Sequence, residues 1–260
     1  MAYKKLKLWF DTDLANELGA KIHLKASFFD VDKYVSFISS RIDDLELKDR
    51  IEVFADAFQA QFSSNYHQAC GVIQSILGPE NELEEGMFKK YYWIMPFAKY
   101  VEKYGLNDFD LSIKTLEEIT KRSTSEYAIR PFLEHLPDKT LHQMLNWSKN
   151  ENFHVRRLSC EGLRPRLPWS SKLNQFIHNP HPILPILHNL KDDPIKYVQK
   201  SVANCINDIL KDNPTVGKTL ITEWSQDCTK ARKWIIKHAL RNLIKSDEKW
   251  AIDLVNSIKY

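Results

Sequence analysis

Acidic and basic side chains stand at helical spacing in the second half of the sequence. Glu161 follows Arg157 by four residues and precedes Arg164 by three, so the three side chains would share one face of a helix. Asp208 stands four residues after Asn204 in a similar segment. A carboxylate among arginines stays ionised, because the neighbouring positive charge favours its charged form. Such a carboxylate can stabilise a cation that develops during a reaction, or orient a water molecule.

Cations and aromatic residues occupy equivalent positions in this segment and in two later ones. When VRRLSCEGLR at 155–164 is aligned with residues 198–207 and 232–241, the positions of Arg157, Glu161 and Arg164 correspond to Lys200, Asn204 and Asn207, and then to Trp234, His238 and Arg241. Two prolines after Arg164 end the helix and project Trp169 from a stiff turn that also carries Arg166. This surface fits a duplex-binding groove, since cations position phosphates and an aromatic ring packs on a sugar or base.

Each of these residues also has an ordinary structural interpretation. Glu161 could form ion pairs on a solvated helix surface, which contribute about a few tenths of a kcal/mol. Asp208 could be a solvated residue near the end of a helix, and Trp169 could be an anchor in the core. The spacing alone does not decide between the chemical and the structural interpretation.

No metal or cofactor site stands out in the sequence. The nine histidines form no HExxH pattern, and His178 and His181 share a proline-rich loop without a cysteine or paired acid. The sequence GKT at 217–219 resembles the end of a phosphate-binding loop, but Asp212 stands where that motif requires glycine. The four cysteines form no CxxC pair, which is typical of reduced cysteines in the cytoplasm. We therefore expect no cofactor, no metal and a cytoplasmic location.

Helical periodicity dominates the sequence, and strand signals are weak. Apolar or small residues recur at Val155, Leu158, Ser159 and Gly162, and again at Val198, Val202, Cys205 and Ile209, as in the buried stripes of two helices. Asp193 stands before a proline and is expected to cap a helix. The aligned segments are offset by 43 and then 34 residues, as in HEAT-like helical hairpins. The sequence therefore predicts an all-α fold, an α-solenoid of HEAT-like repeats whose equivalent faces line one concave, basic surface.

Charge is divided unevenly along the 260 residues. Residues 1–120 hold 14 lysines and arginines against 20 acids, whereas residues 121–260 hold 23 against 14. The basic half indicates a polyanionic partner, most commonly nucleic acid, or else a solvated basic face. No stretch is long and apolar enough for a membrane span, so we expect no membrane partner. We expect a single domain over residues 1–260, with acidic helices in the first part and basic repeats in the second.

Four longer segments allow comparison with known families: SEYAIRPFLEHL at 125–136, VRRLSCEGLRPRLPW at 155–169, VQKSVANCINDILKDNP at 198–214 and WIIKHALRNL at 234–243. They resemble the AlkC branch of the AlkC/AlkD bacterial DNA alkylation-repair glycosylases. The opening KLKLWFDTDLANELG at 5–19 is also similar to that family, so the resemblance covers nearly the whole chain. Members are HEAT-like-repeat proteins that hold duplex DNA and hydrolyse the N-glycosidic bond of bases made cationic by alkylation.

The resemblance implies roles for individual residues. Glu126, Glu161 and Asp208 become the expected catalytic carboxylates, with Asp208 and Glu161 ranked first. Arg157, Arg164 and Trp169 become DNA-binding residues, and the aligned face and the turn add Arg166, Lys200, Asn204, Trp234, His238 and Arg241. Gln199 and Lys200 stand where relatives often have paired arginines, so we expect a weaker phosphate contact there.

The resemblance also implies a function. It predicts a DNA glycosylase that acts on double-stranded DNA containing alkylated bases, typically 3-methyladenine, with 3-methylcytosine and 1-methyladenine also attributed to this branch. We expect a monomer that works without a cofactor. Two competing functions are a DNA-structure binder without catalysis and a protein-binding HEAT scaffold. The three acids together argue against the first, and the cluster of arginines with Trp169 argues weakly against the second.

Overall fold

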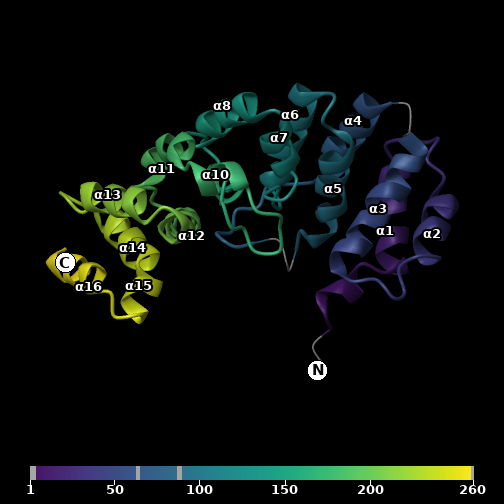
Figure 1. Cartoon of the computed structure of the whole chain (residues 1–260). Coiled ribbons are helices and arrows are strands. Elements are labelled where there is room, and N and C mark those ends of the chain that lie inside the picture. The colour runs from purple at the N-terminus through teal and green to yellow at the C-terminus, as the bar shows by residue number, and fades with distance from the viewer. Residues whose placement is uncertain (1–3, 63–64, 87–89, 259–260) are drawn as a thin grey trace. The chain divides into compact units, whose positions relative to one another are not determined.

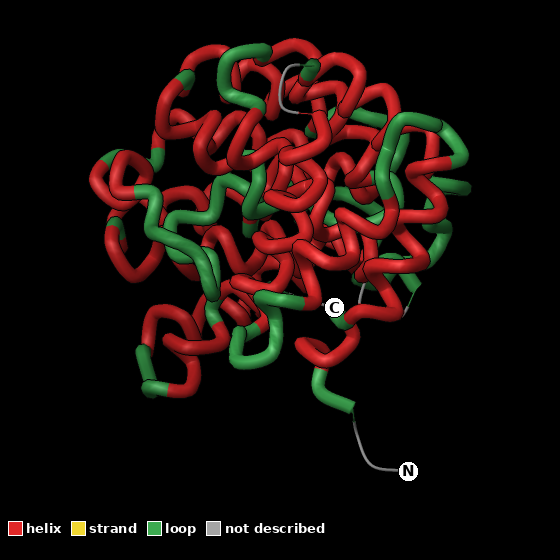
Figure 2. The backbone as a smooth tube through the Cα atoms, turned by 90° about the vertical axis from the view of Figure 1, so that its right-hand side faces the viewer, coloured by secondary structure: helices red, strands yellow, loops and turns green. Residues whose placement is uncertain are grey.

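The computed structural model describes residues 4–62, 65–86 and 90–258. Over these residues the backbone forms helices joined by loops and turns, and it contains no strand (Figures 1 and 2). The predicted all-α class is therefore confirmed. The chain divides into two compact units, Met1–Phe132 and Leu133–Tyr260, each with buried apolar side chains of its own.

The helices of the first unit begin at capping side chains. In its described residues this unit contains η1 (Leu6–Trp9), α1 (Thr12–His23), α2 (Val31–Ser39), α3 (Leu47–Phe62), α4 (Tyr66–Ile76), η2 (Tyr92–Ile94), α5 (Met95–Tyr104) and α6 (Phe109–Thr120). Asp11, Asp30, Asn65 and Asp108 each accept a hydrogen bond from the backbone amide three residues later. These N-caps explain where α1, α2, α4 and α6 begin. α7 (Arg130–His135) then carries the chain from the first unit into the second.

Aromatic rings fill the core of the first unit. The ring centroid of Phe58 lies 4.5 Å from that of Phe62, 5.0 Å from Tyr100 and 5.6 Å from Phe97. All four rings are buried, and they come from α3 and α5, which pack against each other. Aromatic pairs of this kind contribute about 0.5–1.5 kcal/mol beyond the area they bury. The first unit is therefore held together largely by its aromatic side chains.

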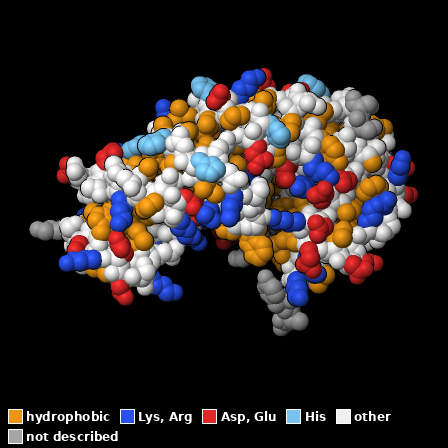
Figure 3. All heavy atoms as spheres, in the orientation of Figure 1, with side chains coloured by type: hydrophobic (Ala, Val, Ile, Leu, Met, Phe, Trp, Pro, Cys, Tyr) orange, Lys and Arg blue, Asp and Glu red, His pale blue; other side chains and the backbone are white. Residues whose placement is uncertain are grey.

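Ion pairs cover part of the surface of the first unit. On the face drawn in Figure 3, acidic and basic side chains are interspersed over this unit. Lys103, for example, pairs with Glu52 at 2.7 Å and with Asp56 at 2.6 Å. Some of the acidic side chains of the first unit are thus neutralised by lysines of the same unit.

The second unit is arranged around its longest helix. It contains α8 (Pro137–Trp147), α9 (Phe153–Glu161), α10 (Asn174–His178), η3 (His181–Ile183), α11 (Leu184–Leu190), α12 (Lys196–Asp212), α13 (Pro214–Trp224), α14 (Lys230–Ala239), α15 (Arg241–Lys245) and α16 (Lys249–Ser257). α12 packs against α9, α13 and α14, and α8 packs against α9. The apolar side chains of both predicted stripes, from Val155 and from Val198, are fully buried. The three aligned segments thus correspond to the neighbouring helices α9, α12 and α14.

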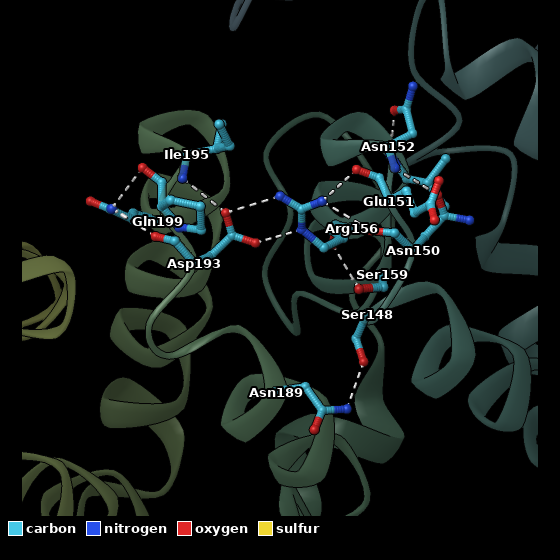
Figure 4. Close-up of polar contacts among 12 residues, drawn as sticks. Ser148, Asn150, Glu151, Asn152, Arg156, Ser159, Asn189, Asp193, Ile195 and Gln199 are labelled. Carbon is cyan, nitrogen blue, oxygen red and sulfur yellow. Dashed lines mark hydrogen bonds and ion pairs between the residues drawn. The ribbon is translucent and has the colours of Figure 1, made fainter. Parts of the chain in front are cut away.

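The start of α12 differs from the sequence prediction. The helix begins at Lys196, and Asp193 is not its cap. Arg156 instead donates its Nε to Asp193 Oδ2 at 2.6 Å and also bonds two backbone carbonyls of the turn before α9 (Figure 4). Gln199 donates its Nε2 to the Asp193 carbonyl at 2.8 Å and is buried, so it faces this network and not a phosphate. The network ties the turn before α9 to the turn before α12.

Candidate functional site

Arg164 lies between the two predicted carboxylates of the second unit. Its Nη1 donates to Glu161 Oε1 at 2.8 Å, and its Nε donates to Asp208 Oδ2 at 2.9 Å. The exposed fractions of Glu161, Arg164 and Asp208 are only 6%, 7% and 3%. One buried guanidinium therefore joins two acids that come from different helices.

The local structure explains how these side chains meet. α9 ends at Glu161, and the Arg164 amide still bonds the Glu161 carbonyl at 3.3 Å, so the turn keeps Arg164 beside this end of the helix. On α12, Ser201 and Asp208 are seven residues apart and share a face. The Ser201 hydroxyl donates to Glu161 Oε2 at 2.6 Å. Sequence reasoning missed Ser201, although its two-turn spacing from Asp208 is the signal that could have found it.

The two carboxyl groups differ in their electrostatic surroundings. Burial acts to raise the pKa of Glu161, but Arg157, Arg164 and the Ser201 hydroxyl outweigh it and hold this pKa below its usual value. For Asp208, burial raises the pKa and outweighs the lowering effect of Arg164. The nearby negative charge of Glu161 also acts to raise it, so the pKa of Asp208 is raised. Glu161 is therefore the more firmly ionised acid, and Asp208 is the better proton acceptor.

Burial decides between the two interpretations of these acids. Glu161 does pair with Arg157 and Arg164, but these pairs are buried and do not lie on a solvated helix surface. Asp208 is also buried, so its interpretation as a solvated residue is wrong. Burying charges in this way is weak evidence for a stabilising role, because the cost of desolvation offsets the attraction. Ionisable groups with perturbed pKa values and a specific charge partner are candidates for chemistry.

Arg157 lies at the edge of this cluster. Its Nη2 is 3.9 Å from Glu161 Oε1, and its guanidinium carbon is 4.5 Å from the centre of the Tyr197 ring. Tyr197, in the first turn of α12, also meets the His154 ring edge-on at 5.7 Å. Arg157 is thus positioned by an acid and by an aromatic ring that sequence reasoning did not single out.

A stiff turn presents Trp169 to solvent. Trp169 is 82% exposed, and its φ of 64° lies in the left-handed region that bulky residues rarely occupy. The Ser170 amide bonds the Leu167 carbonyl at 3.3 Å, so Pro168 and Trp169 are the central residues of a β-turn. Leu167 itself is buried and anchors the turn. The interpretation of Trp169 as a core anchor is therefore wrong, and its strained, exposed position marks it as a candidate ligand contact.

Arg166 ties the same turn to the end of α12. Its Nε and Nη2 donate to the two oxygens of Asp212 at 2.8 Å and 2.6 Å. The hydrogen bond from Arg166 holds the pKa of Asp212 below its usual value in spite of partial burial. Arg166 was expected on DNA, but the structure engages its guanidinium with the last residue of α12, in the bidentate geometry that is specific for a carboxylate. Arg164 differs from expectation in the same way, since its guanidinium is buried between two acids.

The remaining predicted DNA-binding residues gather on α12, α14 and the start of α15. Lys200 is exposed, whereas the others are half-buried. The His238 ring stacks on Trp234 with centroids 4.8 Å apart and an interplanar angle of 11°. Arg241 donates its Nη2 to Asn204 Oδ1 at 3.0 Å. The structure therefore brings these five side chains onto one surface of the second unit.

Glu126 belongs to the first unit. It lies in the connection between α6 and α7, where the Thr124 hydroxyl donates to its Oε2 at 2.7 Å. The side chain is half-buried. The structure thus brings Glu161 and Asp208 into one cluster and places Glu126 in a loop of the other unit.

Two further properties concern ligands and membranes. Among the described residues, no group of three or more histidine, cysteine, aspartate or glutamate side chains is arranged to hold a metal ion. None of the helices in the described segments is long and apolar enough to cross a membrane.

Comparison with known proteins supplies a family. The family of DNA alkylation repair enzymes matches residues 94–250 of the chain. The protein YhaZ of Bacillus subtilis (strain 168) is 38% identical over 235 residues, which are 89% of this chain and 63% of the relative. The chain therefore spans less than two thirds of the length of this curated relative.

Two solved structures have a similar fold. The alkylpurine DNA glycosylase AlkC of Pseudomonas fluorescens, bound to DNA containing an abasic-site analogue, matches with a TM-score of 0.89 and 32% identity over 97% of this chain and 68% of its own. AlkD2 of Streptococcus mutans matches with a TM-score of 0.52 and 21% identity over 81% of this chain and 95% of its own, a likeness of fold alone. These matches confirm the predicted helical-repeat fold.

Proposed function

The chain belongs to the family of DNA alkylation repair enzymes, and from this premise we propose that it is a DNA glycosylase that removes cationic N-alkylated bases from duplex DNA. The observation that carries the proposal is the buried cluster in which Arg164 joins Glu161 to Asp208. The likeness to an alkylpurine DNA glycosylase bound to DNA supports it. The first substrate is 3-methyladenine, and 3-methylcytosine and 1-methyladenine are further candidates. The protein acts as a monomer in the cytoplasm.

The chemistry needs carboxylates and water, and it needs no cofactor. A base alkylated at a ring nitrogen already carries a positive charge, so it leaves without being protonated. The enzyme must stabilise the sugar cation that remains and direct a water molecule to it. Glu161, whose pKa is held low, supplies a firmly negative charge for the sugar cation. Asp208, whose pKa is raised, accepts the proton of the attacking water.

The other residues of the cluster position these acids. Arg164 bonds both carboxylates and so fixes the distance between them, and the Ser201 hydroxyl fixes the second oxygen of Glu161. The low exposure of the cluster keeps out bulk water, which strengthens the field that the acids exert on the sugar. Glu126 is the third candidate acid, and it contributes less than the other two.

Contacts with DNA come from residues at the surface. Trp169 packs on a sugar or base of the damaged strand, which its exposure and fixed turn permit. Arg157 lies between the buried acids and solvent and contacts a phosphate near the lesion. Arg164 and Arg166 contribute through the side chains that they position, because acids occupy their guanidinium groups.

The experiment that tests the function identifies released bases directly. DNA treated with a methylating agent is incubated with the protein, and the free bases are separated by chromatography. Release of 3-methyladenine, lost in Glu161→Gln and Asp208→Asn, supports the glycosylase. Duplex binding without release of any base would indicate a DNA-structure binder, and failure to bind duplex DNA or heparin would indicate a protein scaffold.

A further inference from the structure

A group of basic side chains on α12, α14 and α15 forms no ion pair with the residues that the structure describes. Five of the six arginines of this unit pair with a carboxylate: Arg156, Arg157, Arg164, Arg166 and Arg232. Arg241 is the exception among the residues that the structure describes. Its guanidinium donates to the His238 carbonyl at 2.6 Å and to Asn204 Oδ1 at 3.0 Å. Both acceptors are neutral groups, so neither compensates its charge.

Two neighbours of Arg241 share this property. Lys200, exposed on α12, forms no ion pair or hydrogen bond with any residue that the structure describes. His238 stacks on Trp234, and neither of its ring nitrogens has a hydrogen-bond partner within the described ranges. Lys196 approaches the Trp234 ring to 3.7 Å and adds a further positive charge. Donors and positive charge are thus concentrated at a surface where none of these side chains forms an ion pair with a described residue.

The electrostatics agree with this geometry. Partial burial lowers the pKa of His238, and the charges of Arg241 on α15 and of Lys200 and Lys196 on α12 lower it further. α13 adds no charge that acts on this ring. The pKa of Arg241 is also lowered, first by burial and then by Arg164, while Asp208 opposes the shift. The basic side chains therefore repel one another when no anion is bound. Arg241 also interacts electrostatically with Arg164 and Asp208 of the buried cluster.

We propose that Lys200, His238 and Arg241 form a binding site for one phosphate of the DNA backbone, and that His238 takes up a proton when this phosphate binds. The proposal rests on the proposed DNA-binding function and adds the group that is bound and its pH dependence. The phosphate supplies the missing counter-ion, and Trp234 holds the His238 ring at a fixed angle.

The sign of the pH dependence follows from the charges. In the free protein, partial burial and then the charges of Arg241, Lys200 and Lys196 disfavour the protonated His238 ring, whereas a bound phosphate favours it. Because the complex binds one proton more than the free protein, affinity rises as the pH falls through the pKa of the complex and levels off below the pKa of the free protein. A rise of one unit in this pKa on binding corresponds to an affinity change of about tenfold.

The test measures binding of an undamaged duplex, so that it does not depend on catalysis. Fluorescence anisotropy gives the Kd from about pH 5.5 to about pH 8 and at several salt concentrations, for the wild type, His238→Gln, Arg241→Gln, Lys200→Gln and Lys200→Arg. Wild-type affinity should rise about tenfold toward acid pH, and His238→Gln should abolish this rise. Arg241→Gln and Lys200→Gln should each reduce the salt slope by up to about 0.9, the contribution of the one phosphate that they share, and Lys200→Arg should preserve it.

Controls separate this site from other effects. Lys149→Gln removes an exposed charge from the turn after α8, a helix separated from α14 by α9 and α12, and it should leave the pH dependence intact. The proposal is overturned if His238→Gln keeps the wild-type pH dependence, or if Arg241→Gln keeps both affinity and salt slope. At equal ionic strength, inorganic phosphate should displace DNA no better than chloride.

Excision from methylated DNA is measured in parallel, so the two proposals can fail separately. A protein that shows the pH-dependent binding but releases no base would refute the glycosylase alone. A protein that releases bases while His238→Gln and Arg241→Gln bind like the wild type would refute the phosphate site alone.

Discussion

Replacing Arg164 with methionine should destabilise the protein strongly, although methionine matches the arginine side chain as far as Nε. The substitution leaves Glu161 and Asp208 buried without the guanidinium that now bonds both of them at 2.8 Å and 2.9 Å. Removing one partner from a buried pair costs about 3–5 kcal/mol, because the remaining charge is left without compensation. Arg157, 3.9 Å from Glu161, can offset only part of this for one of the acids. We expect a loss in the free energy of unfolding of about 3–5 kcal/mol near neutral pH.

The pH dependence of this loss identifies its cause. Without Arg164 the folded-state pKa of Glu161 should rise above its unfolded value, and that of Asp208, which is already raised, should rise further. An acid whose folded pKa is raised reduces stability at high pH, and the deficit disappears as the pH falls and the folded protein takes up protons. Urea unfolding followed by circular dichroism should therefore show a large deficit at about pH 7.5 that shrinks toward about pH 4. Adding Glu161→Gln and Asp208→Asn to Arg164→Met should restore most of the stability.

Arg166→Met is the matched control. It removes a bidentate pair with Asp212, but the Arg166 side chain is 34% exposed, so the expected loss is below about 1 kcal/mol. Equal losses in Arg164→Met and Arg166→Met would refute this reasoning. A deficit of Arg164→Met that did not shrink in acid would refute it as well, since the uncompensated acids could not then be its origin.

Three further predictions concern DNA binding and rate. Trp169→Ala should weaken binding of lesion-containing DNA by about 1–3 kcal/mol and lower the excision rate. Trp169→Gly should do the same and, because glycine suits the positive φ, should also raise the free energy of unfolding in urea by about 1 kcal/mol. Unchanged affinity in both variants would remove Trp169 from the interface. Ser201→Ala removes a hydrogen bond that lowers the pKa of Glu161, so the lower part of the acid limb of the rate–pH profile, where Glu161 takes up its proton below the pKa of Asp208, should move to higher pH. A profile that falls in height without moving there would show only a structural role. Excision should continue undiminished in excess chelator, and activity restored specifically by zinc or magnesium would contradict the proposed metal-free chemistry.

Local patterns predicted the helices well, because a buried stripe depends only on spacing along one helix. Val155 and Val198 begin such stripes, and both are fully buried as expected. The surroundings of Arg164 could not be predicted in this way. Its burial depends on Asp208, which lies 44 residues later on another helix. Asp193 shows the same limit, since a local cap was expected and Arg156, 37 residues earlier, bonds it instead.

The turn at Trp169 was partly predictable. Its prolines indicated a stiff turn, but the choice between a buried and an exposed ring depends on which neighbour fills the core. Leu167 fills that place, so Trp169 points outward. Repeat alignment brought Lys200, His238 and Arg241 to one surface in advance, because equivalent positions of stacked repeats are neighbours. That none of these three side chains forms an ion pair with a described residue became visible only when the ion pairs of the other arginines of the second unit were known.

Single-turnover excision of 3-methyladenine from a duplex oligonucleotide, with binding measured on the same DNA, tests the roles of Glu161 and Asp208 most directly. If these acids stabilise the sugar cation and activate water, Glu161→Gln and Asp208→Asn should each lower the rate by roughly 10²-fold or more, which corresponds to about 2.7 kcal/mol of transition-state stabilisation. DNA binding should persist or tighten, because a buried negative charge that repels the phosphates of the DNA has been removed. Rates close to wild type in both variants would contradict the proposed active site.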